Sequence, residues 1–127
     1  MIKVPPVEVL SDFDISDYTV PALEKVVDCR GFMYIVQDSV FPDYIKVGRT
    51  NDCKKRLQMY NADKPFKTAK MIYISRMFEN VNDVERRILD YLYDCTAPTT
   101  LSREWFLVEH TEKIINIIVK AEDRLDT

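Results

Sequence analysis

The chain has 127 residues, of which 46% are hydrophobic and 31% charged, and its formal net charge is −3. These values indicate one soluble globular domain, and the lack of a long apolar run or of a basic, apolar N-terminus argues against a membrane span and a secretory signal. Three widely spaced cysteines and a single histidine favour reduced thiols in an intracellular, cytoplasmic protein and disfavour a zinc site.

The predicted elements divide the chain into an arm and one folded domain. Residues 1–28 are acidic and carry prolines, so we expect an extended arm, with a short helix from Pro21, docked on the domain. Residues 29–127 are expected to form the domain itself. Its predicted elements are strands at 32–37, 44–48 and 68–78, helices at 52–60, 80–93 and 111–124, and a short extended piece at 104–108. This pattern predicts an α/β (α+β) sandwich, in which helices flank a small three-stranded antiparallel sheet.

Charge is distributed unevenly along the sequence. Residues 46–76 carry nine bases and two acids, whereas residues 1–28 carry two bases and six acids, and residues 77–127 carry six bases and eleven acids. A cationic middle between acidic ends indicates a polyanionic partner, and the alternative is a solvated basic surface balanced by acidic neighbours.

Two predicted helices each direct one charged residue toward the sheet. Glu85 falls on the flank of an apolar face, and Arg56 falls within another. The two faces comprise Val81, Val84, Ile88, Tyr91 and Leu92 on one helix, and Cys53, Leu57, Met59 and Tyr60 on the other. A salt bridge at the edge of the core would explain Glu85, and so would a metal ligand. An Arg56–Glu85 pair is one explanation of both residues, and a joint site for phosphate and a divalent cation is the other.

The first two strands supply further candidates. Tyr34 shares a strand face with Phe32 and Val36, and Lys46 shares one with Tyr44 and Gly48. If the hairpin pairs these faces, Tyr34 and Lys46 become neighbours. Packing is the common role of such a tyrosine, and solvent exposure is the common state of such a lysine.

Four segments, "GFMYIV", "KVGRT", "KKRL" and "VERRI", together resemble the GIY-YIG nuclease superfamily over about residues 31–108. Tyr34 matches the tyrosine of the first motif, and Gly48 matches the glycine of the second. Lys46 stands where the second motif has its tyrosine. A K-x-G form and a terminal "EWF" segment, here residues 104–106, are typical of the phage, viral and bacterial branch of that superfamily.

The resemblance implies a metal-dependent endonuclease that hydrolyses phosphodiester bonds of DNA, in the host cytoplasm if the chain is a phage or viral protein. The implied catalytic residues are Tyr34, Lys46, Arg56 and Glu85, with Glu85 as the ligand of Mg²⁺ or Mn²⁺. The residues expected to bind substrate are Gly48, Arg49, Lys54, Lys55, Tyr60, Lys64 and Lys67. We expect nucleic acid as the partner, with DNA favoured over RNA.

Two alternative functions stay open. The family's late asparagine has no clear counterpart, since Asn116 lies in the last predicted helix. This departure and Lys46 favour a module that kept the fold and lost catalysis. Such a module would bind nucleic acid, or would act as an inhibitor that binds a protein partner through its acidic termini. Lys46 itself has two candidate roles, a general base as the neutral amine or a phosphate ligand as the ammonium.

Overall fold

The computed structural model describes residues 15–21, 29–97 and 103–125, and the helix expected from Pro21 lies largely outside these ranges. The elements are β1 (Phe32–Asp38), β2 (Tyr44–Thr50), α1 (Cys53–Asn61), β3 (Ala69–Ile74), α2 (Val81–Cys95), β4 (Trp105–Leu107), a 3-10 turn (Val108–His110) and α3 (Thr111–Leu125). Every predicted strand and helix of the domain is present, with bounds that shift by a few residues. In the described part of the chain, no helix combines the length and apolar character needed to span a bilayer.

The sheet has four strands rather than three, in the order β3-β1-β2-β4, and all its pairs are antiparallel. The expected strand count was therefore wrong. The added strand is β4, which pairs with the outer edge of β2 through Ile45↔Phe106 and Lys46↔Trp105. Three residues are too few to show a strand period, so the sequence indicated only an extended piece.

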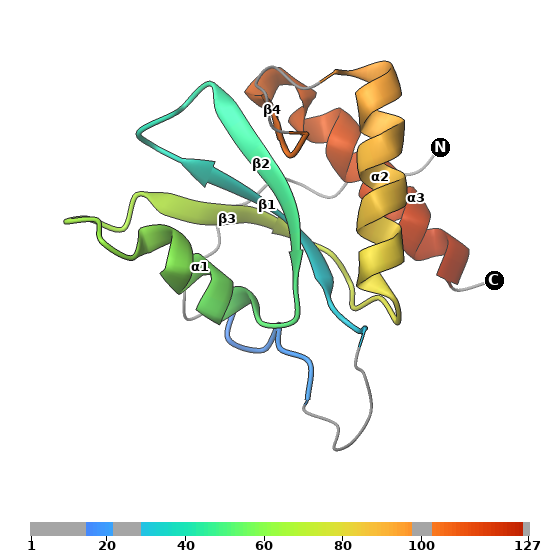
Figure 1. The fold of residues 1–127 in the computed structure, drawn as a ribbon, viewed down its shortest axis with the longest axis horizontal. Coiled ribbons are helices and arrows are strands. Elements are labelled where there is room, and N and C mark those ends of the chain that lie inside the picture. The colour runs from blue at the N-terminus through green and yellow to red at the C-terminus, as the bar shows by residue number, and fades with distance from the viewer. Residues whose placement is uncertain (1–14, 22–28, 98–102, 126–127) are drawn as a thin grey trace.

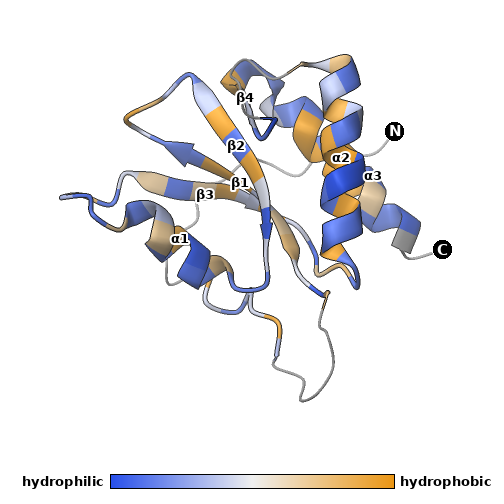
Figure 2. Ribbon diagram, viewed as in Figure 1, coloured by the Kyte–Doolittle hydropathy of each residue, from blue (hydrophilic) through white to orange (hydrophobic). Residues whose placement is uncertain are grey.

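Both faces of the sheet are covered, which gives the predicted α+β sandwich (Figure 1). Along β1, Met33 and Ile35 join the larger core cluster with α2 and α3. The alternate residues Phe32, Tyr34 and Val36 join a smaller cluster with α1. Figure 2 shows hydrophobic residues along β1 and on parts of α2 and α3. The central strand is thus buried on both sides, and α1 and α2 lie on opposite faces.

Each of the first two α-helices begins at a side-chain cap. The Asp52 carboxylate accepts the Lys55 amide hydrogen at 3.0 Å, and the Asn80 side chain accepts that of Asp83 at 3.2 Å. Two residues assigned to apolar faces are exposed instead, namely Met59 and Tyr91. A helix on a sheet buries a stripe about 100° wide, and these residues lie outside it.

Part of the N-terminal arm contacts the domain. Ile15 is fully buried in the smaller cluster under α1. The Cys53 amide donates to the Tyr18 carbonyl at 3.0 Å, and the Val20 amide donates to the Asn51 carbonyl at 2.8 Å. The start of α1 is therefore fixed from the outside by residues 15–20.

Candidate functional site

The β1–β2 hairpin brings Tyr34 and Gly48 into direct opposition. The two residues are paired in the ladder, and Val36 pairs with Lys46, so all four share the face covered by α1. A Cβ atom on Gly48 would lie 2.5 Å from the Tyr34 hydroxyl oxygen and 2.6 Å from its Cζ. The tyrosine ring thus lies across the backbone of β2, and a glycine is required beneath it.

Helix α1 places Tyr60 and Arg56 over this hairpin, one turn apart. The Tyr60 and Tyr34 hydroxyl groups share a hydrogen bond of 2.7 Å, and their rings meet edge to face. Burial, reinforced by Tyr60, raises the pKa of Tyr34 far above its usual range, although the Arg56 charge acts in the opposite direction. Tyr34 is therefore a neutral phenol at neutral pH.

Arg56 is partly buried and lies close enough to Tyr34 to influence its ionisation. Within the described residues, no hydrogen bond or ion pair engages its guanidinium. The Arg56–Glu85 pair considered from the sequence does not form, because Glu85 contacts Arg49 instead. A fork of donors near a partly buried hydroxyl pair is suited to a phosphate oxygen.

Lys46 lies among partners that stabilise a positive charge. Its Nζ is 5.1 Å from the centre of the Tyr60 ring and 6.0 Å from that of Trp105. The Glu104 carboxylate lies 3.6 Å from the same nitrogen. Sequence reasoning assigned no role to Glu104, and only the unpredicted β2–β4 pairing brings it here. Its position directly before "WF" was the one available signal.

Glu85 approaches from α2, on the other side of the sheet, and its side chain is 16% exposed. Arg49 Nε lies 3.1 Å from one carboxylate oxygen. Burial nevertheless raises the pKa of Glu85, with Arg49 lowering it and Glu104 raising it further. Lys46 also acts on this carboxyl group, which places Glu85 within electrostatic range of the hairpin residues.

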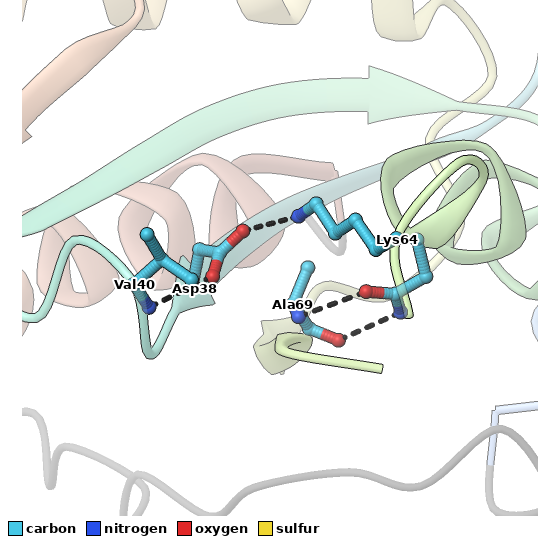
Figure 3. A network of polar contacts seen from close by, with 5 residues as sticks. Asp38, Val40, Lys64 and Ala69 are labelled. Carbon is cyan, nitrogen blue, oxygen red and sulfur yellow. Dashed lines mark hydrogen bonds and ion pairs between the residues drawn. The ribbon is translucent and has the colours of Figure 1, made fainter. Parts of the chain in front are cut away.

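The other lysines named from the sequence lie on α1 and on the loop that follows it. Lys54 and Lys55 are exposed in the first turn of α1. Lys67 is exposed in the loop that follows α1. Lys64 is engaged by the Asp38 carboxylate at the end of β1 (Figure 3). Lys64 therefore already has a structural partner, unlike the lysines of α1.

The donor set is compatible with a divalent cation that keeps most of its water. Glu85 is a half-buried carboxylate, and its partner Arg49 is 44% exposed, so the guanidinium has room to move into solvent when a cation takes its place. Among the described residues, no group of three or more His, Cys, Asp or Glu side chains gathers to enclose a metal. One carboxylate with substrate and water oxygens suits Mg²⁺ or Mn²⁺ better than a closed protein cage does.

Comparison with known proteins gives the class, which is nuclease-like. Residues 31–121 match the T5orf172 domain, a phage-associated domain from the clan of GIY-YIG and HNH-type endonucleases. The chain belongs to the T5orf172 domain family. No curated protein and no solved structure was found to match it.

Proposed function

We propose that the protein is a metal-dependent endonuclease that hydrolyses phosphodiester bonds of DNA. One observation carries this proposal. Two cations, Lys46 and Arg56, lie around the hydrogen-bonded pair of Tyr34 and Tyr60, and the half-buried Glu85 is within electrostatic range. Cations, a protonated phenol and a carboxylate are the groups that phosphodiester hydrolysis uses.

Phosphate binding falls to the two cations. The Arg56 guanidinium donates to the non-bridging oxygens, and the Lys46 ammonium neutralises the charge that develops on them. Arg49, whose side chain is 44% exposed, exchanges its Glu85 contact for a neighbouring phosphate, which a guanidinium binds through a fork of donors. Lys54, Lys55 and Lys67 contact phosphates further along the strand, and Gly48 leaves room for the Tyr34 ring of the phenol pair.

Water activation falls to the phenol pair. Tyr34 is protonated at neutral pH, so it does not begin the reaction as a phenolate base. It orients a water molecule by hydrogen bonding. As that water loses a proton to the Tyr34 oxygen, the Tyr34 proton moves to Tyr60, the less buried of the two, and the proton that Tyr60 carried is released to bulk solvent. Glu85 would hold Mg²⁺ or Mn²⁺, and the bound cation would supply Lewis-acid stabilisation of the leaving oxygen.

Cleavage of labelled DNA and RNA, with Mg²⁺, Mn²⁺ or a chelator, tests the proposal. Glu85→Gln should abolish cleavage and weaken metal binding. At pH 7 it should leave the melting temperature unchanged or raised. The raised pKa of Glu85 means that its stabilising contribution is present below the unfolded pKa and is lost as pH rises through the folded value. Glu112→Gln, an exposed change on α3, is the control, and full activity of folded Glu85→Gln would contradict the assignment.

A second function is a nucleic-acid-binding module without catalysis. The ion pairs Lys46–Glu104 and Arg49–Glu85 favour it, because each engages a residue of the proposed centre with a neighbouring charge. Binding without cleavage in any metal, together with an unaltered affinity in Glu85→Gln, would support this function over the nuclease.

A further inference from the structure

Phe66 is exposed to an unusual degree for so apolar a residue. It lies in the loop 62–68, between α1 and β3, and 76% of its surface is accessible to solvent. The adjacent β1–β2 turn, residues 39–43, carries two more exposed apolar side chains, Val40 and Phe41. Figure 1 shows both loops on the same side of the molecule, away from α2 and α3. An aromatic ring displayed in this way indicates a surface that contacts a partner.

The two loops are held together by a network of polar contacts (Figure 3). The Asp38 carboxylate accepts from the Lys64 ammonium and from the Val40 amide. The Ser39 amide donates to the Thr68 carbonyl at 3.1 Å. At the base of the loop, the Asn61 side chain donates to the Ala69 carbonyl at 3.0 Å and accepts from its amide at 2.9 Å.

The backbone of the 62–68 loop is restricted as well. Pro65 fixes its own φ and disfavours a helical conformation at Lys64. Asp63 adopts the left-handed conformation, with φ of 65°, a conformation that aspartate tolerates better than most residues do. The Thr68 amide donates to the Phe66 carbonyl at 3.0 Å. The loop that carries Phe66 is therefore already ordered, so binding through Phe66 loses less conformational entropy.

The charge around Phe66 indicates the chemistry of the partner. Lys64 and Lys67 flank it in the sequence, and Asp63 is the only acid of the loop. A wholly apolar partner gains nothing from these cations, whereas a nucleic acid offers phosphates to the exposed Lys67 and base faces to the ring. Exposed aromatic rings beside basic side chains form the usual platform for unpaired bases.

We propose that Phe66 stacks on an unpaired base of the nucleic-acid substrate, so that the protein prefers DNA with a single-stranded segment near the cleaved bond. This inference rests on the proposed nuclease function and specifies its substrate. Phe66 follows Tyr60 by six positions, so their Cα atoms lie at most about 22 Å apart. At about 3.4 Å per stacked nucleotide, the base lies within roughly six nucleotides of the bond.

The test measures DNA binding by the full chain, using fluorescence anisotropy. A chelator is present to prevent cleavage. The two probes are a fully paired duplex and the same duplex with a short unpaired tract. Phe66→Ala should weaken binding to the second probe roughly 5- to 100-fold, the usual effect of losing one stacking ring. Phe66→Trp should retain affinity, and Phe66→Leu, which keeps apolar area without an aromatic face, should resemble Phe66→Ala.

Tyr91→Ala is the matched control, because Tyr91 is an exposed aromatic on α2, and its affinity should not change. Equal losses on both probes, or no loss with Phe66→Ala, would overturn the inference. Self-association that disappears in Phe66→Ala, seen by sedimentation velocity, would assign the surface to a second copy and also overturn it. Phe66-dependent binding without cleavage in Mg²⁺ or Mn²⁺ would support the inference while contradicting the nuclease. Cleavage of DNA by the wild type, together with unchanged binding in the Phe66 variants, would support the nuclease while contradicting the inference.

Discussion

Gly48 and Tyr34 illustrate how one residue can specify the position of another. The phenol ring lies where any side chain at position 48 would have to be. Because Tyr34 pairs directly with Gly48 in the ladder, the missing side chain leaves room for the ring to cross the strand and reach Tyr60. The glycine is therefore required for the geometry of the phenol pair.

Gly48→Ala should displace the Tyr34 ring and weaken both the fold and the site. Forcing a methyl group into a packed region costs on the order of 1–3 kcal/mol, measurable as a lower midpoint in urea denaturation. Cleavage per folded molecule should also fall. Tyr34→Phe is the comparison, because it keeps the ring and removes only the hydroxyl. An unaltered midpoint in Gly48→Ala would show that the ring moves aside without cost.

Substitutions at Lys46 distinguish its two candidate roles, a phosphate ligand and a general base. Glu104 and two aromatic rings lie near the Lys46 Nζ as partners for a positive charge, which corresponds to the phosphate-binding role. Lys46→Arg should then keep substantial cleavage, while Lys46→Met should lose roughly 10²- to 10³-fold, as when one oxyanion-stabilising group is removed.

Rates for both variants at several pH values decide between the two roles of Lys46. A guanidinium does not deprotonate at working pH. If Lys46 acts as the general base, Lys46→Arg should therefore lose as much cleavage activity as Lys46→Met. Full activity of both variants would place Lys46 outside the site.

The site was predictable from the sequence only in part. Helical spacing and strand parity place Arg56, Glu85 and Tyr34 on buried or half-buried faces, because both depend on local periods of the chain. The partners of these residues depend on tertiary structure. Arg49, rather than Arg56, reaches Glu85 because α1 and α2 cover opposite faces of the sheet, and Glu104 reaches Lys46 because β4 pairs with β2.

At the level of elements, the sheet was predictable except at its edge. The strands β1, β2 and β3 have long β-branched and aromatic runs, whereas β4 has only three residues. The contacts that tie the β1–β2 turn to the α1–β3 loop were also hidden. They join Asp38 to Lys64 and the Ser39 amide to the Thr68 carbonyl, and no local pattern reports such pairs. Lys64 consequently has a structural partner that its basic neighbourhood did not suggest.

Asp38→Asn should loosen the contact between these two loops in a pH-dependent way. Burial raises the pKa of Asp38, but hydrogen bonds from Lys64 and the Val40 amide outweigh it and hold the pKa below its usual range. The stabilisation is therefore present above the unfolded pKa, about 3.9, and is lost as pH falls through the folded value.

Denaturation of wild type and Asp38→Asn should differ by about 1–2 kcal/mol at pH 7 and by much less near pH 3. Lys64→Met is the companion variant, and it should cost at least as much at pH 7 because it leaves the carboxylate buried without its cation. A difference that stays constant between the two pH values would show that the Lys64–Asp38 pair contributes nothing.

Across the whole molecule, the proposed site wraps around one strand of a two-sided sandwich. Tyr34, Lys46 and Arg56 lie on the α1 side, and Glu85 comes from the α2 side near the same strand. The cationic segment 46–76 spans β2, α1 and β3. The uneven charge seen in the sequence therefore has a structural counterpart, since its basic residues belong to consecutive elements around the hairpin.

Replacing Lys54 and Lys55 together by Gln should weaken nucleic-acid binding similarly for all sequences. Both side chains are exposed, so the fold should not change. Each lost phosphate contact should reduce the slope of log affinity against log salt by roughly one unit. Lys113→Gln with Lys120→Gln, exposed lysines on α3, is the matched control. An unchanged slope would show that Lys54 and Lys55 are solvated surface residues that do not contact phosphates.

The burial of Cys53 at the first position of α1 makes its thiol a probe of local opening of that helix. Its thiol is fully buried, and burial, reinforced by Asp52, raises its pKa to about 12. Only a thiolate reacts with disulfide reagents, so Cys53 becomes reactive only when the start of α1 separates from the sheet. Cys95 is exposed and reacts without any such opening. The ratio of the two labelling rates, measured with and without nucleic acid, therefore reports how often the helix carrying Arg56 and Tyr60 opens, and it needs no introduced cysteine.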